Sequence, residues 1–422
     1  MKRDYATTFL AEALVVGSYL LAFRLVASAL GTTGFGEYAL ARRTLAMLVP
    51  LGALSMDVAV ARFVAYAVSE RSDRVRGYVP ASTALVLGAA AIVGSVLLLF
   101  ASPLAYLFFG SASYSRLVAP MALLVLGGGL HGIAYGFHRG SSKIQRANLL
   151  MAINQAIVPI LAIAVAGGSV ETILLAMGAG WTLVSLAFLA TLRMSFDGLR
   201  PRITELARYG VPRVPGELLR LGLFALPSIL IAHAADITVA GSVAFGVAAV
   251  GMLGTALAPV GFVMLPAAAR MLAQGSIEQL RQQVLRIAWL TAAALAVAIV
   301  VVELFAPQIV TTYLGPRFAG TADSIRVIVP AALPWGIYMS LGSVIDAYHV
   351  HPVNARNMAI AFAVFVLSAG VLTLISVPAL AIAGTFVVSL YVLGALTLWE
   401  VHTITRPTTL PRAIEPKVGP LL

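Results

Sequence analysis

The sequence contains no cysteine, and charged residues make up only 11% of its 422 positions. The lack of cysteine excludes disulfide bonds, thiol catalysis and cysteine-based metal sites. The low charge excludes an ordinary water-soluble domain, in which about a quarter of the residues are charged. Hydrophobic residues make up 60% of the chain, so the sequence predicts an integral membrane protein.

Long extramembrane segments are also missing, because no connection between the apolar runs exceeds about 20 residues. The activity is therefore expected among the membrane-spanning segments. The runs are continuous over about 20 residues, the length of a spanning helix, whereas spanning β-strands are about 10 residues long and alternate in polarity. The sequence predicts an all-α polytopic membrane protein with about twelve transmembrane helices, at 5–30, 38–68, 79–100, 117–137, 149–166, 172–192, 210–232, 242–269, 284–305, 324–346, 357–375 and 381–401.

Basic residues are distributed unevenly between alternate connections. Nineteen of the 28 Lys and Arg residues fall on one side and three on the other, and such an excess marks the cytoplasmic side of a membrane. Both termini are predicted in the cytoplasm, with MKRDY leading into a retained first helix rather than a removed signal peptide. Orientation and anionic lipid explain the net charge of +11 better than nucleic acid binding does.

Four weak internal similarities recur about 205 to 210 residues apart, among them GFGEYALA with AGSVAFGV and PLAYLFFG with PQIVTTYLG. Repeats of this kind occur in transporters whose halves are related by an axis along the membrane normal. The sequence predicts two pseudo-symmetric six-helix bundles around a central cavity. Their predicted limits are 1–192 and 210–401, with a cytoplasmic linker at 193–209 and a disordered Pro-rich cytoplasmic tail at 402–422.

The remaining six basic residues lie within the apolar runs: Arg24, Arg42, Arg43, Arg62, Arg213 and Arg220. A charge within the membrane is costly and usually faces a bundle interior or a water-filled cavity. Both halves contribute such residues, which indicates an anionic cargo, and the planar guanidinium fork suits a diphosphate. The alternative is that each side chain reaches the lipid headgroups at an interface.

The depth of these arginines in the membrane and the helix face on which each lies follow from their spacing along the sequence. Arg24 precedes the first outer turn by six residues and Arg42 and Arg43 follow it by five or six, so all three lie about 8 to 9 Å into the membrane. Arg42 and Arg43 are separated by about 100° of helix rotation and cannot point along one line. Arg213, Glu217 and Arg220 share one helix face.

Three acidic residues are candidates for ion coupling or for charge pairing: Asp57, Glu217 and Asp346. Glu217 can neutralise Arg213 or Arg220. Asp57 can pair with Arg62 or with a basic residue on another helix. The sequence holds no convincing set of metal ligands, and no nucleophile–base pair or paired carboxylates that would indicate an enzyme.

Several segments resemble the polysaccharide flippases, the Wzx-like branch of the multidrug/oligosaccharidyl-lipid/polysaccharide (MOP) exporter superfamily. These are the first turn LGTTGFGEYALA with Gly36-Glu37-Tyr38, the run ending in Ala61-Arg62-Phe63, and the segments YLFFG and TYLG. The resemblance covers nearly the whole chain, but its motifs are loose. The second half departs from the first at FGVAAV, which stands where Arg42 and Arg43 stand in the first half.

The resemblance implies a protein of the cytoplasmic membrane that flips polyprenyl-diphosphate-linked oligosaccharide from the cytoplasmic to the outer leaflet for surface polysaccharide biosynthesis. It implies a cationic central cavity for the diphosphate, to which the six arginines belong by position. No cofactor is expected besides a coupling ion, H⁺ or Na⁺. Expected partners are the lipid-linked oligosaccharide, the bilayer, and a polysaccharide polymerase or glycosyltransferases.

Two other functions fit parts of the sequence. A cation-coupled multidrug exporter of the same superfamily would favour acidic residues in its cavity, whereas this chain has more deep arginine than deep Asp or Glu. A membrane-bound polymerase or glycosyltransferase would need a sizeable extramembrane segment that carries acids, and the connections are too short for one. The sequence therefore favours a transporter over an enzyme.

Overall fold

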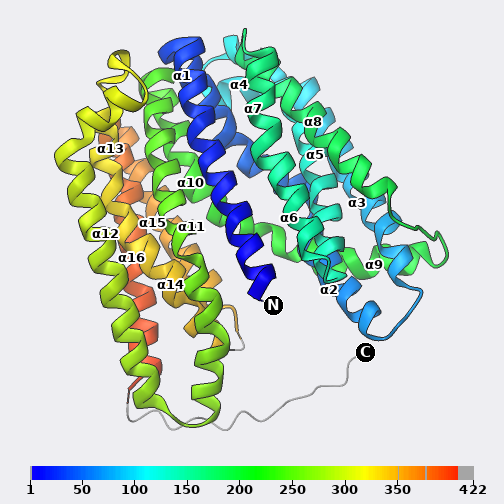
Figure 1. Cartoon of the computed structure of the whole chain (residues 1–422). Helices are drawn as coiled ribbons and strands as arrows, with labels where there is room; N and C mark the ends of the chain where they lie inside the picture. Colours follow the sequence, from blue (N-terminus) through cyan, green and yellow to red (C-terminus); the bar gives the residue numbers. More distant parts are fainter. Residues whose placement is uncertain (1, 350, 376–377, 407–422) are drawn as a thin grey trace. The chain divides into compact units, whose positions relative to one another are not determined.

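The structure, a computed structural model, describes residues 2–349, 351–375 and 378–406 (Figure 1). Helices make up most of these residues, and no strand occurs among them. A helix satisfies its backbone hydrogen bonds within one segment, which the hydrocarbon core of a membrane requires. The prediction of an all-α polytopic membrane protein is confirmed.

The helices follow one another with short connections. The α-helices are α1 (Lys2–Ala53), α2 (Met56–Ser69), α3 (Val75–Leu99), α4 (Ala101–Phe109), α5 (Ser115–Gly140), α6 (Ile144–Ala152), α7 (Val158–Ala166), α8 (Val170–Ala190), α9 (Leu199–Gly210), α10 (Val214–Ala234), α11 (Ile237–Ala273), α12 (Ile277–Tyr313), α13 (Thr321–Ile328), α14 (Ala332–Tyr348), α15 (Val353–Leu374) and α16 (Ala379–Ile404). Shorter elements are η1 (Ala112–Tyr114), the π-helix η2 (Ile153–Ile157), η3 (Val211–Arg213), η4 (Pro316–Phe318) and η5 (Val329–Ala331).

Eleven helices in the described residues are long and apolar enough to cross a membrane. The difference from the twelve predicted lies in α1, a 52-residue helix that contains the first predicted run and much of the second. Gly31 interrupts α1 with φ 66° and ψ −162°, a conformation that glycine adopts readily and other residues avoid. The predicted connection at 31–37 is therefore wrong in length, because it shrinks to a kink at this single glycine.

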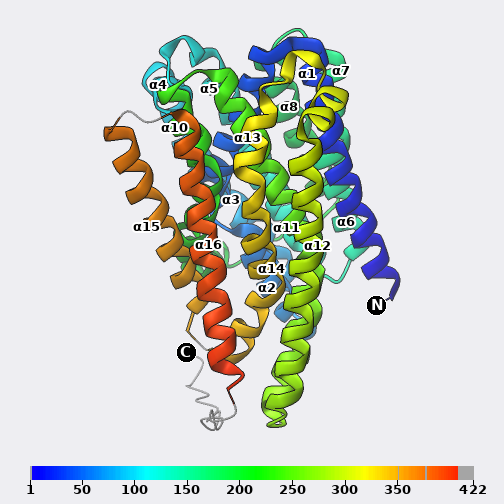
Figure 2. The ribbon, with the colours of Figure 1, turned by 90° about the vertical axis from the view of Figure 1, so that its left-hand side faces the viewer.

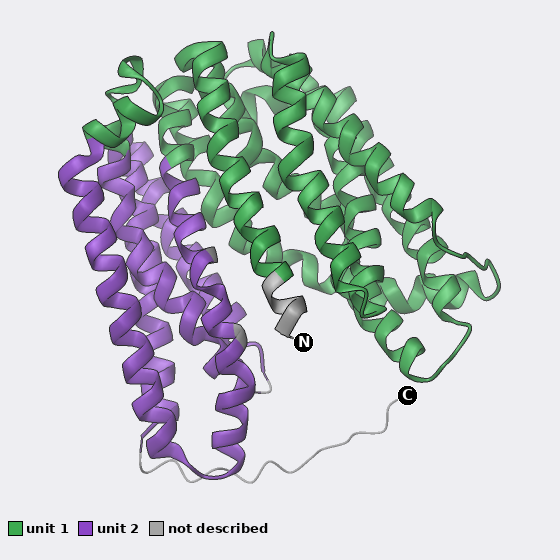
Figure 3. Cartoon of the chain, in the orientation of Figure 1, with its two compact units in different colours: residues 1–245, 307–324 green, residues 246–306, 325–422 purple. Residues whose placement is uncertain are grey.

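Two compact units make up the fold (Figure 3). Unit 1 contains residues 1–245 and 307–324, and unit 2 contains residues 246–306 and 325–422. The chain passes from one unit to the other within α11, α12 and α13 rather than in loops. The predicted division into sequence halves at 193–209 stays a prediction.

Glycines allow the helices of unit 1 to pack closely around α5. A Cβ atom at Gly127 would lie 2.8 Å from Trp181 of α8, and one at Gly128 would lie 2.8 Å from Val49 of α1. The next glycine of the run faces α3. Each of the three consecutive glycines thus packs against a different neighbouring helix, which agrees with the close packing that small residues give in membrane proteins.

Unit 2 contains a second buried cluster of apolar side chains on α11, α12, α14, α15 and α16. Helices α15 and α16 lie side by side (Figure 2). Gly394 of α16 packs against Pro334, where an added Cβ would lie 2.7 Å from the proline ring. Helix α16 ends at Ile404, so the predicted tail begins in helix, and its residues 407–422 lie outside the described part of the chain.

Helix α9 is a short amphipathic helix in the segment predicted as a loop. Leu206 is buried, and Leu199 and Ile203 pack against the apolar cluster of unit 1. Arg200 and Arg208 are exposed on the opposite side. The apolar residues recur every three or four positions, the period of a helix, so the sequence contained the signal for this element.

Candidate functional site

The six arginines of the apolar runs predicted from the sequence all belong to unit 1. Three lie on α1, one on α2, one on η3 and one on α10. Within the described residues, none of the six has a carboxylate oxygen within 4.0 Å. In unit 2, by contrast, Arg326 is paired with Glu303 and Arg356 with Glu400. Unit 1 therefore concentrates positive charge that no ion pair neutralises.

Arg42 is held between two aromatic rings. Its guanidinium carbon lies 4.6 Å from the ring centroid of Tyr19 and 5.9 Å from that of Trp181, and it donates a hydrogen bond to the Tyr19 hydroxyl. Its Nε is buried, and no residue that the structure describes forms a hydrogen bond with it. Aromatic faces attract a cation through their quadrupoles but carry no net charge, so the positive charge of Arg42 is stabilised without being neutralised.

Arg24 and Arg43 bind backbone carbonyls. Arg24 donates to the carbonyl oxygens of Thr312 and Tyr313 at 3.2 and 3.0 Å, in the last turn of α12, where carbonyls have no partner within the helix. The Nε of Arg43 donates to the Ala244 carbonyl of α11 at 3.4 Å. Arg42 and Arg43 thus point to different neighbours, and the carbonyls that Arg24 and Arg43 contact come from the second half of the sequence.

The second spanning segment is broken at Leu54 and Ser55, between α1 and α2. Both residues adopt left-handed backbone angles, with φ of 52° and 53°, which costs a non-glycine residue about 1–2 kcal/mol. Gly210 packs on the break, since a Cβ there would lie 2.5 Å from the Leu54 carbonyl oxygen. The Ser55 hydroxyl donates to Glu217 at 3.4 Å. Broken helices of this kind line the binding sites of many transporters.

Two of the three predicted acidic residues lie at this break. Asp57 is in the first turn of α2 and Glu217 is in the first turn of α10. Glu217 interacts electrostatically with Asp57 and with Arg220, and Asp57 interacts with Arg139 of α5. Of the two kinds of partner predicted for Asp57, a basic residue on another helix interacts with it electrostatically, but within the described residues neither Arg139 nor Arg62 forms an ion pair with it.

Arg62 and Arg213 converge on one side chain of α9. Their guanidinium carbons lie 4.8 and 3.5 Å from the ring centroid of Tyr209. Of the two arginines predicted to neutralise Glu217, Arg220 interacts with it electrostatically, whereas Arg213 contacts Tyr209. Arg220 itself is exposed and has no hydrogen-bond partner within the described residues, which leaves its guanidinium donors available to a ligand.

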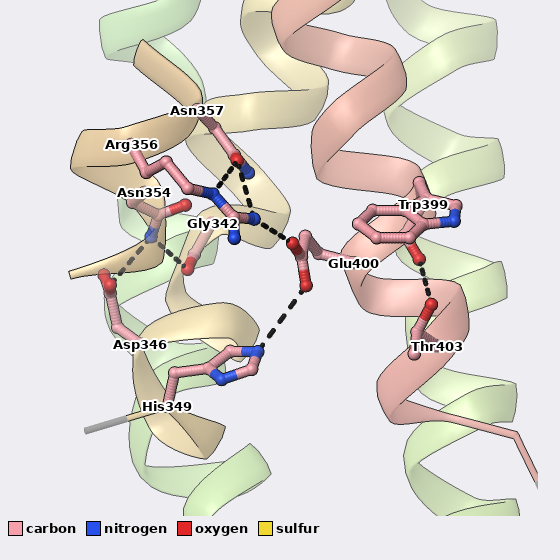
Figure 4. Close-up of polar contacts among 9 residues, drawn as sticks. All are labelled: Gly342, Asp346, His349, Asn354, Arg356, Asn357, Trp399, Glu400 and Thr403. Atoms are coloured by element: carbon pink, nitrogen blue, oxygen red, sulfur yellow. Dashed lines mark hydrogen bonds and ion pairs between the residues drawn. The ribbon is translucent and has the colours of Figure 1, made fainter. Parts of the chain in front are cut away.

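The third acidic residue, Asp346, lies in unit 2 (Figure 4). It accepts a hydrogen bond from Asn354 at 2.7 Å, which joins α14 to α15. In the same region Glu400 of α16 accepts a hydrogen bond from Arg356, and the His349 Nε2 lies 3.6 Å from the other carboxylate oxygen. In the part of the chain that the structure describes, no three His, Asp or Glu residues come together as metal ligands.

A buried polar network in unit 1 was missed by sequence reasoning. Asn154 of the π-helix donates to His131 at 3.1 Å and to Ser185 at 3.0 Å, and Trp181 donates to the Asn154 carbonyl. π-helical turns often occur at functional sites. The Asn-Gln pair inside the apolar run 149–166 was the available signal. Trp181 belongs to this network and also lies against the Arg42 guanidinium.

Comparison with known proteins gives the fold. No family model and no curated protein matches the sequence, but solved structures match it over almost its whole length. A multidrug resistance MATE family transporter of the MOP superfamily, in an inward-facing conformation, has a TM-score of 0.73 at 15% identity, covering 94% of this chain and 96% of that chain. The lipid II flippase MurJ, in an inward closed conformation, has a TM-score of 0.71 at 11% identity, covering 96% and 90%.

A third structure comes from Pyrococcus furiosus. It is a MOP superfamily transporter whose binding pocket is described as reversed in polarity, with a TM-score of 0.62 at 14% identity and 96% of each chain covered. At such identities the likeness concerns the fold alone. The chain therefore has the fold of MOP superfamily transporters, a fold seen in both MATE transporters and MurJ. The narrower resemblance to the polysaccharide flippases stays a prediction.

Proposed function

We propose that the protein translocates a polyprenyl-diphosphate-linked oligosaccharide across the cytoplasmic membrane by alternating access. The observation that carries the proposal is the set of six arginines from the predicted apolar runs, all in unit 1, none of which forms an ion pair within the described residues. Arg42 and Arg43 are half-buried and the other four side chains are exposed on the protein, and an unpaired positive charge is costly wherever it lies within a membrane. An anionic head group that enters among these residues would supply the missing countercharge.

The chemistry of the side chain favours phosphate groups. A guanidinium presents paired donors in one plane and matches phosphate oxygens with two parallel hydrogen bonds. Arg220 is exposed without a hydrogen-bond partner in the described residues, and Arg42 keeps a buried Nε without one. These donors can turn to a diphosphate without first breaking an ion pair.

The transport mechanism is supported by the fold. Other chains of this fold include transporters and a lipid flippase, and the broken segment at Leu54 and Ser55 provides the kind of discontinuity at which transporters bind their cargo. We propose that the diphosphate passes along the arginines while the polyprenyl tail stays in the bilayer. Asp57 and Glu217 are the proposed sites of H⁺ or Na⁺ coupling, and no chemical step on the cargo is required.

Replacing Arg24 or Arg220 by alanine tests the proposal. Each change is expected to abolish surface polysaccharide and to leave lipid-linked oligosaccharide accumulated on the cytoplasmic side, although the protein still reaches the membrane. The matched control is Arg317→Ala, which removes an exposed arginine from a connection predicted on the outer side. Normal polysaccharide in both test variants would contradict the proposal.

A cation-coupled multidrug exporter is the second candidate. It is favoured by the TM-score of 0.73 with a MATE family transporter and by the placement of Asp57 and Glu217 in the first turns of α2 and α10 at the same helix break, because neighbouring acids can exchange a cation for a drug. An exporter would confer drug resistance when overproduced, and its deletion would leave the surface glycan unchanged. Drug susceptibility and glycan staining of the same deletion strain separate the two functions.

A further inference from the structure

Arg62, Tyr209 and Arg213 form a compact arrangement in unit 1, here named the Tyr209 clamp. Arg62 lies on α2, Tyr209 near the end of α9, and Arg213 in η3. The Arg213 guanidinium carbon lies 3.5 Å from the Tyr209 ring centroid, and that of Arg62 lies 4.8 Å from it. The Tyr209 hydroxyl accepts a hydrogen bond from Arg62 at 3.4 Å, and its backbone carbonyl accepts one from Arg213.

The clamp brings two like charges close together. Because both distances share one ring centroid, the two guanidinium carbons are at most about 8 Å apart. Both arginines are exposed, and in the described part of the chain neither has a carboxylate within 4.0 Å. The aromatic ring compensates the repulsion only in part. An anion that accepts from both guanidinium groups would complete the arrangement.

Packing holds the tyrosine in place. Its ring meets the Phe63 ring edge-on at 5.5 Å, and Phe63 stacks on Tyr78 at 5.8 Å. Tyr78 in turn donates a hydrogen bond to Glu205 of α9 at 3.1 Å. The ring that orients both guanidinium groups is therefore fixed between α2, α3 and α9, and less conformational freedom is lost when a ligand binds.

The clamp lies at the end of unit 1 that the distribution of basic residues assigns to the cytoplasm. Helix α9 lies there beside the ends of α2 and α3 (Figure 1), and the backbone N–H of Ser195 donates to the carbonyl of Arg76 at 2.9 Å, which ties the connection before α9 to the first turn of α3. The exposed side chain of Arg200 adds positive charge to the same helix. Anionic lipid head groups concentrate at such a surface.

We propose that the Tyr209 clamp captures the diphosphate head group of a polyprenyl lipid from the cytoplasmic leaflet and precedes the arginines of α1 and α10 on the transport path. The inference rests on the proposed function. Two guanidinium forks set by one ring can bind the two phosphates of a diphosphate, since each fork matches one phosphate with parallel hydrogen bonds. A phosphate monoester would engage both forks less completely.

Binding of undecaprenyl diphosphate to the full chain in phosphatidylcholine nanodiscs tests the clamp. Arg62→Ala and Arg213→Ala are each expected to raise the dissociation constant at least tenfold. The matched control is Arg208→Ala, which removes the exposed arginine next to Tyr209 and should change it less than twofold. Tyr209→Phe keeps the ring and should bind within threefold of the wild type, whereas Tyr209→Leu should lose binding as the arginine variants do.

Parallel titrations with phosphatidylglycerol and with inorganic pyrophosphate identify the source of the phosphate. Pyrophosphate is expected to compete weakly and phosphatidylglycerol hardly at all. Equal competition by phosphatidylglycerol would overturn the assignment to a diphosphate lipid, and equal binding by wild type, Arg62→Ala and Arg213→Ala would overturn the clamp itself. The proposed function fails separately, through normal surface polysaccharide in the Arg24→Ala and Arg220→Ala strains.

Discussion

Replacing Gly36 by alanine is expected to force two helices of unit 1 apart. A Cβ atom at Gly36 would lie 2.9 Å from the carbonyl carbon of Ile237 in α11, and nearer still to its oxygen. These are backbone atoms that cannot rotate away. Gly241 faces the same crossing, where an added Cβ would lie 3.1 Å from the Gly36 nitrogen and nearer to its Cα. The backbones of α1 and α11 thus touch where the two sequence halves meet within this unit.

The size of the effect follows from these distances. Ordinary van der Waals contact begins near 3.4 Å, so the two helices must separate by about 1 Å to admit the methyl group of alanine. Overpacking of this kind costs about 1–3 kcal/mol, and removing a glycine from a helix interior returns about 0.5–1 kcal/mol. The net destabilisation is about 1 kcal/mol, within a range of about 0–2.5 kcal/mol, and Gly36→Val is expected to exceed it.

Thermal unfolding of the detergent-purified protein, followed by size-exclusion chromatography after heating, measures this effect. Gly36→Ala should lower the midpoint by a few degrees. Gly88→Ala is the matched control, because Gly88 lies inside α3 with no heavy atom within 4 Å of an added Cβ, and it should leave the midpoint unchanged or raise it. A Gly36→Ala protein as stable as the Gly88→Ala protein would refute the close crossing.

Three further changes probe other contacts by the same thermal assay. Arg356→Ala removes the guanidinium that pairs with Glu400, whose residue is 7% exposed, and should destabilise the protein by about 1–3 kcal/mol. Glu400→Gln should be less harmful, because Arg356 is exposed and stays hydrated without its partner; equal effects of the two changes would contradict this reasoning. Trp181→Leu removes one ring from Arg42 together with the hydrogen bond to Asn154, and its cost should be about 0.5–2 kcal/mol smaller when Arg42 is already methionine; the same cost in both backgrounds would contradict the contact between Trp181 and Arg42. Arg71→Gly relieves a φ of 51° at an exposed residue and should stabilise by about 1 kcal/mol, whereas a lower midpoint would show that the arginine makes a compensating contact.

The spanning helices were predictable because lipid leaves the chain few choices. Each apolar run of about 20 residues must become a helix whatever its neighbours do. The break at Leu54 and Ser55 was not predictable in this way, since neither residue is a helix breaker. It depends on packing from Gly210, a residue about 155 positions away in the sequence, and only the tertiary structure brings that glycine to the break.

The positions of the arginines within the apolar runs could be read from the sequence, but their partners could not. Helix rotation separates Arg42 from Arg43, yet it does not say that Tyr19 and Trp181 receive the first and a carbonyl of α11 the second. One signal was present and unused. Arg213 follows Tyr209 by four residues, the spacing at which side chains meet on a helix, and this pair proved to be half of the clamp.

The position of Trp181 gives the protein an internal optical reporter. The chain has four tryptophans, and this indole both donates to a backbone carbonyl and faces the Arg42 guanidinium. A nearby cation shifts and quenches indole emission, and an anion that binds near the cation would change the electric field at the indole. With phenylalanine at the other three positions, the fluorescence of one unlabelled side chain would report in real time whether an anion binds near Arg42, as the proposed function requires.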